Sequence, residues 1–144
     1  MALDPNTIAL AVNSLVSANL ASANVTVNEI TLSPERAPQV NVLMPGFALK
    51  DERVGAARTE KTYSVPVDCY HWGDDGRQAL QNLGALVNSV SAIFQNISNR
   101  TLSGAAGVEI SRLVGGDAIE TPGSAMGVYV GYRLTVEVDT LETN

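Results

Sequence analysis

Apolar and polar residues alternate from residue 61 to residue 72, and this period of two predicts a half-buried β-strand. One face of the predicted strand carries Tyr63, Val65, Val67, Cys69 and His71. The opposite face carries Thr62, Ser64, Pro66 and Asp68. The first face is therefore expected to be buried in a core, and the second to be polar.

A helix is predicted directly after this strand. Residues 73–76 (Gly-Asp-Asp-Gly) break the strand, and apolar residues then recur at steps of three and four, which lines one stripe of a helix. The residues of this stripe are Leu80, Leu83, Val87, Val90, Phe94 and Ile97. Asp74 and Asp75 are interpreted as caps for the free amides of the first turn. A metal site is disfavoured, because hard cations usually draw oxygens from several spaced positions.

The chain before the central strand predicts one helix and two short strands. Asp4 and Pro5 form a helix start, and the apolar spacing that follows extends this helix to about residue 20. Residues 24–32 and 39–44 are predicted strands, with a bulge near Asn28 and Glu29 in the first. The turn signals at residues 33–38 predict that these strands form an antiparallel pair.

The chain after the long helix predicts two more strands. Residues 108–114 form the first, which is expected to end at Gly115 and Gly116, so that residues 115–127 form a long loop. Residues 128–139 alternate most cleanly, with Val128, Val130, Tyr132, Leu134, Val136 and Val138 on one face. The other face carries Tyr129, Arg133, Thr135, Glu137 and Asp139, and it is expected to be exposed to solvent or to contact a partner. The order of elements predicts one α+β domain, residues 1–144, with a mostly antiparallel four- to five-stranded sheet, two helices packed on one face and a long β-hairpin arm.

The arm is predicted at residues 46–60, which show no sustained period of two or of 3.6. It is interpreted as a long hairpin tip, and a solvated loop and a partner-contacting arm both remain open. Its charged candidates for partner or subunit contact are Lys50, Asp51, Glu52, Arg53, Arg58 and Glu60. Tyr70 and Trp72 are further candidates, because they lie on the strand face opposite Val65 and Val67, and exposed aromatics often anchor protein interfaces.

Composition removes several classes of function. Nine basic residues against fifteen acidic ones leave a net charge of −6, which opposes general binding to a phosphate backbone. Cys69 is the only cysteine, so no internal disulfide can form, and its place on the apolar face predicts a buried thiol. The N-terminus lacks a secretory signal, and no apolar run is long enough for a membrane span, so a cytosolic product is expected.

No catalytic signature is found. His71 is the only histidine, and it lies two positions from Cys69 on one strand face, about 7 Å away along the backbone, too far for an easy hydrogen bond. Residues 104–107 and 115–116 carry glycines in no phosphate-loop pattern. Neither an enzyme nor a cofactor or metal site is therefore expected.

The element order, together with residues 38–46 (Pro-Gln-Val-Asn-Val-Leu-Met-Pro-Gly), the charged loop, the long strand and the closing strand, resembles the tail terminator proteins of long-tailed bacteriophages. The resemblance spans nearly the whole chain. It implies a virion protein, assembled in the host cytoplasm, that forms a six-membered ring on the finished tail tube. Such a ring stops tube polymerisation and then mediates joining of the tail to the filled head.

The partners implied by this resemblance are further copies of the chain, the tail tube protein and a neck or head-completion protein. DNA would pass through an acidic ring without specific binding. Related neck, head-completion and tail-completion proteins share much of the pattern and are an alternative. From a different class, a small-ligand or regulatory binding module also remains open, with an enzyme third.

Overall fold

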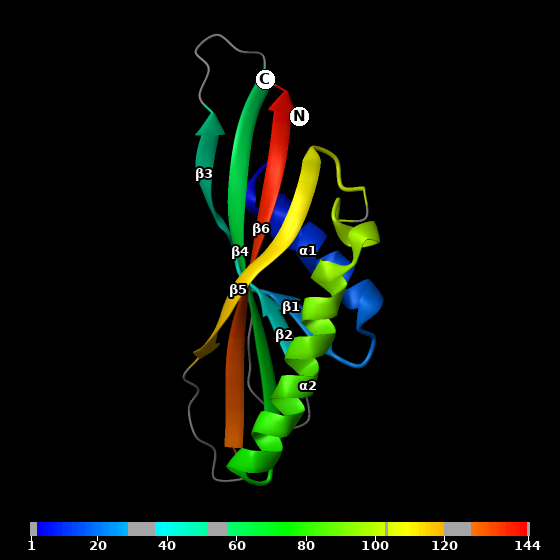
Figure 1. Cartoon of the computed structure of the whole chain (residues 1–144), viewed down its shortest axis with the longest axis vertical. Coiled ribbons are helices and arrows are strands. Elements are labelled where there is room, and N and C mark those ends of the chain that lie inside the picture. The colour runs from blue at the N-terminus through cyan, green and yellow to red at the C-terminus, as the bar shows by residue number, and fades with distance from the viewer. Residues whose placement is uncertain (1–2, 29–36, 52–57, 103, 120–127, 144) are drawn as a thin grey trace.

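Two long strands, β4 (Arg58–Gly73) and β6 (Val128–Thr143), form the backbone of the fold. They pair antiparallel without a break from Arg58 opposite Thr143 to Gly73 opposite Val128. At about 3.3 Å per residue, each of these strands is about 50 Å long, and they run along the length of the molecule (Figure 1). This computed structural model describes residues 3–28, 37–51, 58–102, 104–119 and 128–143.

The remaining strands flank this pair. The sheet has six strands in the order β1 (Asn24–Val27), β2 (Gln39–Val42), β4, β6 and β5 (Val108–Ile119), with β3 (Gly46–Asp51) also pairing with β4. All pairs are antiparallel except β1 with β2. The helices are α1 (Pro5–Asn19), α2 (Gly76–Gln95) and a short 3₁₀ turn, η2 (Ile97–Asn99).

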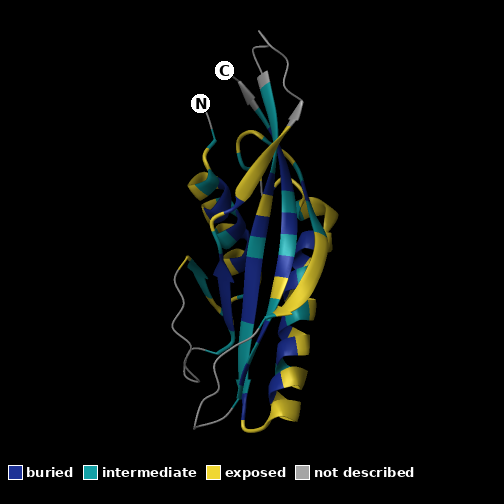
Figure 2. Cartoon of the chain, turned by 90° about the vertical axis from the view of Figure 1, so that its left-hand side faces the viewer, coloured by how far each residue is buried: buried dark blue, intermediate teal, exposed yellow. Residues whose placement is uncertain are grey.

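Both α-helices cover the same face of the sheet, as Figure 1 shows. Their apolar stripes and the inward residues of β2, β4 and β6 form one core, which includes Val12, Val16, Val67, Val90 and Val136. The burial colouring in Figure 2 shows buried positions along the central strands and exposed positions on the outward face of α2. The predicted α+β class, the mostly antiparallel sheet and the packing of two helices on one face are confirmed.

Both predicted helix starts are also confirmed. The Asp4 carboxylate accepts a hydrogen bond from the Thr7 backbone N–H at 2.7 Å, and Asp75 accepts one from Gln78 at 2.8 Å. Each aspartate therefore caps an amide that has no partner within its helix. Within the described residues, no helix is long and apolar enough to span a membrane.

The prediction of an antiparallel pair near the N-terminus is wrong, because β1 and β2 run parallel. β1 ends at Val27, where Asn28 adopts a left-handed φ of 51° and its side chain accepts a hydrogen bond from the Met44 N–H. Residues 28–38 therefore connect β1 to β2, and this connection is longer than the predicted six-residue turn. Parallel pairing requires the chain to return to the end of the sheet where β1 begins, and a connection of this length can span a four-residue strand. The predicted strand residues 29–32 lie outside the described residues.

The predicted stripe of the long helix is rotated from the observed one. Leu83, Val90 and Phe94 are buried as expected, but Leu80 is 61% exposed and Ile97, beyond the end of α2, is 74% exposed. Ala79, Leu86 and Ile93 complete the buried face. A Cβ on Gly73 would overlap the backbone of Ala79, so α2 starts in close contact with the end of β4 and its small alanine faces the strand.

Two predicted loops contain strand. β5 continues through Gly115 and Gly116 to Ile119, with an irregularity between Leu113 and Gly115. A Cβ on Gly116 would overlap the ring of Tyr132, so this glycine allows close packing instead of ending the strand. Residues 46–51 form β3, which lacked a period in the sequence because it is an edge strand with exposed side chains at Phe47, Ala48 and Leu49.

Candidate interaction surface

The charged residues predicted for partner contact gather where β3 ends and β4 begins. Lys50 and Asp51 are the last residues of β3, Arg58 is the first of β4, and Glu60 lies opposite Asp51 in the register. Glu52 and Arg53 lie outside the described residues. The structure therefore confirms a hairpin of β3 and β4 and places this charged group at one end of the molecule (Figure 1).

Tyr70 and Trp72 lie at the other end of β4. Ten residues separate Glu60 from Tyr70 along one extended strand, which corresponds to about 33 Å. The charged group and the two aromatic residues therefore cannot contribute to one compact site. If both contact partners, they contact different surfaces.

An apolar surface that the sequence analysis did not predict lies on β3. Phe47 is 52% exposed and Leu49 is 48% exposed. The Lys61 ammonium lies 4.8 Å from the centroid of the Phe47 ring, and this ring lies 5.7 Å from that of Tyr63. We call Phe47, Leu49 and Lys61 the β3 surface. Exposed apolar side chains on an edge strand are typical of a protein contact, because the edge also offers unpaired backbone groups.

Tyr70 and Trp72 are half-buried in the sheet. The Tyr70 hydroxyl donates to Asp68 Oδ2 at 3.3 Å, and burial, with the nearby Asp68 charge, raises the pKa of Tyr70 to about 12. Trp72 lies opposite Tyr129, and its indole Nε1 is buried without a hydrogen-bond partner. The interface role of these two residues stays a prediction.

The sheet face opposite the helices carries paired charges. Arg133 holds Asp68 with two hydrogen bonds, Nε to Oδ1 at 2.7 Å and a terminal nitrogen to Oδ2 at 3.0 Å. Arg112 binds Asp139 at 2.8 Å and Glu137 at 2.6 Å. Hydrogen bonds to these carboxylates raise the pKa values of both arginines. Asp68 lies on the predicted polar face of β4, but it is only 2% exposed there.

No protein-family model matches the sequence, and no curated protein matches it. A solved structure of the virion of a native gene transfer agent particle contains a chain with the same fold. The TM-score is 0.55 at 10% identity, and the alignment covers 94% of this chain and 95% of the other. A likeness at this identity shows a common fold over nearly the full length of both chains.

The gene transfer agent chain and this chain therefore share one α+β architecture, whose surfaces decide what each chain contacts. Among the residues that the structure describes, no three His, Cys, Asp or Glu side chains come together to hold a metal ion. Two surface cavities of about 340 and 220 Å³ lie beside α2, and neither is lined by the charged candidates or by Tyr70 and Trp72.

The predicted burial of Cys69 is confirmed. Cys69 is 0% exposed, and burial, with the neighbouring Asp68 charge, raises the pKa of its thiol from 9.0 to about 12. His71 Nδ1 instead accepts a hydrogen bond from the Trp72 N–H at 2.8 Å, and burial lowers the pKa of His71. The Cys69 thiol is therefore protonated and inaccessible at neutral pH.

We expect the native Cys69 thiol to react with a disulfide reagent at pH 8 far more slowly than in urea-unfolded protein. Because the folded pKa is raised, the protonated thiol stabilises the fold fully below pH 9, and this stabilisation is lost as pH rises towards 12. Stopped-flow thiol titration and urea unfolding between pH 7 and about 11 measure both effects. Cys69→Val should flatten the alkaline decline, and equal native and unfolded reaction rates would contradict burial.

Proposed function

We propose that this chain is a structural protein of a phage-like virion, and more specifically that it forms a ring at the head-proximal end of a tail. The observation that carries the proposal is the shared fold with a chain of the gene transfer agent virion, which covers 94% of this chain. In this role the chain ends tail-tube polymerisation and mediates joining of the tail to the head. A neck or head-completion protein is the alternative station in the same particle.

The sheet edges support a ring. Among the described strands, β3 pairs only with β4, and β5 pairs only with β6, so each has one free edge. In a closed ring each subunit presents one surface to the next, and a neighbouring subunit can cover such edges. Six copies are proposed from the resemblance to tail terminators.

The β3 surface is the proposed contact with the tail tube or a neighbouring subunit. It projects at the end of the molecule where β3, β4 and the end of β6 extend past α2 (Figure 1). Lys50 lies near the end of β3 and Arg58 begins β4, so both residues belong to the same hairpin as Phe47 and Leu49. Acidic groups on the partner would complement them. The net charge of −6 supports free passage of DNA through the ring.

Removal of the subunit from its particle tests the proposed function. Without a ring to cap the tube, tails should polymerise beyond their normal length and fail to join filled heads. Electron microscopy of particles assembled with and without the chain measures both properties. Complete particles with tails of normal length in its absence would exclude a terminator and a joining protein alike.

We expect Leu49→Gln to weaken assembly without unfolding the chain. Leu49 is 48% exposed, so its replacement removes contact area from the β3 surface and little from the core. Loss of one well-packed apolar contact at an interface costs about 1 kcal/mol or more, which lowers affinity at least about fivefold. Sedimentation velocity of the purified chain measures the association.

Leu80→Gln is the matched control for this variant, because Leu80 is 61% exposed on α2, away from β3. It should associate as the wild type does. Equal association of Leu49→Gln and wild type would remove the β3 surface from the interface. Thermal unfolding of both variants establishes that each is folded.

A further inference from the structure

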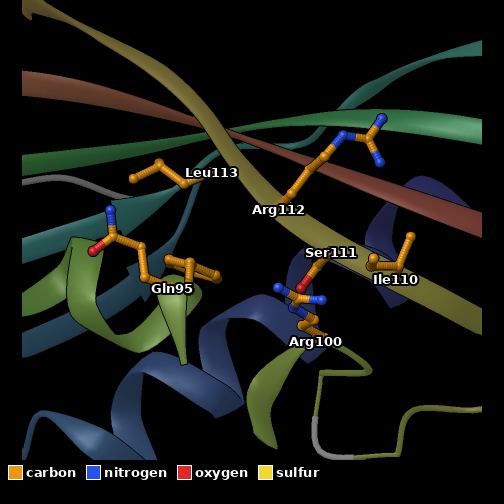
Figure 3. A pocket seen from close by; sticks show the side chains of 7 residues that line it. Gln95, Arg100, Ile110, Ser111, Arg112 and Leu113 are labelled. Atoms are coloured by element: carbon orange, nitrogen blue, oxygen red, sulfur yellow. The ribbon is translucent and has the colours of Figure 1, made fainter. Parts of the chain in front are cut away.

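A surface cavity of about 340 Å³ lies between β5 and the segment where α2 ends. Phe94, Ile110 and Leu113 contribute its apolar walls, and Gln95, Arg100, Ser111 and Arg112 are its polar lining residues. Figure 3 shows Gln95 on the last turn of α2 and Arg100 just after it, both facing the strand that carries Ser111. The cavity therefore combines hydrogen-bond donors with an apolar lining, which is the usual composition of a ligand site.

Ser111 carries an unused hydrogen-bonding group in this cavity. The residue is 1% exposed, and its hydroxyl Oγ has no hydrogen-bond partner. Its side chain points from β5 toward Arg100 (Figure 3), and its backbone N–H donates to the Arg100 carbonyl at 2.6 Å. A buried hydroxyl without a partner is destabilising, so a ligand that reaches Ser111 Oγ would gain this hydrogen bond.

Arg100 supplies an unneutralised positive charge at the same place. Arg112 and Arg133 are neutralised by carboxylates within the chain, and the side chain of Arg112 points away from the cavity (Figure 3). Among the described residues, no carboxylate forms an ion pair with Arg100. One guanidinium fork and one hydroxyl therefore lie side by side without an internal anion, while the Gln95 amide lies apart from them (Figure 3).

We propose that this cavity is a carboxylate-binding site. The guanidinium fork of Arg100 matches the two oxygens of a carboxylate, and the Ser111 hydroxyl can donate to one of these oxygens. Arg112 also lines the cavity, but its side chain points away from it and pairs with Glu137 and Asp139. Among the described lining residues, Arg100 is therefore the one cation left to neutralise a ligand, so a singly charged carboxylate is neutralised, whereas a phosphate dianion keeps excess negative charge. Phe94, Ile110 and Leu113 would contact the methylene groups behind the carboxylate.

Two sources can supply such a group. One is an acidic side chain of a second copy of this chain, which carries fifteen acidic residues against nine basic ones. The other is a small free carboxylate. The inference does not depend on the proposed function, since either source satisfies the same cavity.

Glutarate is a suitable probe, because it carries a carboxylate on a short methylene chain like that of a glutamate side chain. Calorimetric titration of the full chain, against sodium chloride of equal ionic strength, should show saturable binding. Arg100→Gln should weaken binding about tenfold to a hundredfold, because a charge-assisted pair is lost. Arg77→Gln, which removes an exposed arginine from α2, should bind glutarate as the wild type does.

Ser111→Ala separates a ligand-binding role from a structural one. It should weaken glutarate binding while leaving the unfolding midpoint unchanged or raised, because it removes a buried hydroxyl that has no partner in the free protein. A lowered midpoint with unchanged binding would assign Ser111 to the fold alone and overturn its role in the site.

Sedimentation velocity of the same samples distinguishes the sources. If glutarate and Arg100→Gln both weaken self-association, the natural occupant is an acidic side chain of a second copy. If binding occurs with no change in self-association, the occupant is a free carboxylate. The proposal is overturned if glutarate neither binds nor changes self-association, and also if Arg100→Gln binds glutarate as tightly as Arg77→Gln.

Discussion

Leu83→Ala should lower the free energy of unfolding by about 2–5 kcal/mol, which is a large part of the stability of a single domain. Leu83 is 5% exposed and lies in the core between α2 and the sheet. Its truncation removes apolar contact and leaves a cavity that the neighbouring side chains fill only in part. Urea unfolding followed by circular dichroism measures the change.

Leu80→Ala is a matched control, because it makes the same chemical change three residues earlier in the same helix. Leu80 is 61% exposed, so the variant should stay within about 0.5 kcal/mol of the wild type. The two variants together test which face of α2 contacts the sheet. Equal losses, or a larger loss for Leu80→Ala, would contradict the observed orientation and restore the face predicted from the apolar spacing.

Arg133→Ala should cost about 2–4 kcal/mol, because it leaves the Asp68 carboxylate buried without its main partner. The side chain of Asp68 is 3% exposed and receives two hydrogen bonds from Arg133; among the described side chains, truncation leaves it only the Tyr70 hydroxyl. The value is set below that for a fully buried pair because the Arg133 side chain is 44% exposed and partly screened by water. Urea unfolding at neutral pH measures the change.

The physical cause of this loss can be isolated with a second substitution. Asp68→Asn combined with Arg133→Ala should be more stable than Arg133→Ala alone, because the buried charge is then absent. Arg77→Ala serves as the control, since Arg77 is exposed and the substitution should have little effect. A loss for Arg133→Ala no larger than for Arg77→Ala would show that Asp68 does not need its arginine.

The long strands could be predicted from the sequence because each has one buried face. In β4, Tyr63, Val65, Val67 and Cys69 are all 0% exposed, so burial imposes a strict period of two. In β3, residues 46–49 are all exposed, and no period of two appears among them. Caps were also predictable, since Asp4 and Asp75 each act on an amide three residues away.

Other features depend on contacts between distant segments. The apolar pattern placed Leu80 on the buried face of α2, because leucine is larger than the neighbouring Ala79. The observed orientation of the helix follows instead from the close approach of Gly73 to Ala79. The burial of Asp68 depends on Arg133, 65 residues later. Likewise, the cavity joins Arg100 and Ser111 only because β5 packs beside the end of α2. Spacing along the chain carries no signal for any of these three.

The chain is proposed to act as an assembly subunit through its outer surfaces. Negative-stain electron microscopy of the purified chain, alone and mixed with tail tubes, tests this proposal most directly. The account predicts closed rings of uniform size, expected to contain six copies, that attach to one end of the tube. Particles that stay monomeric at all concentrations and leave the tube ends bare would contradict it.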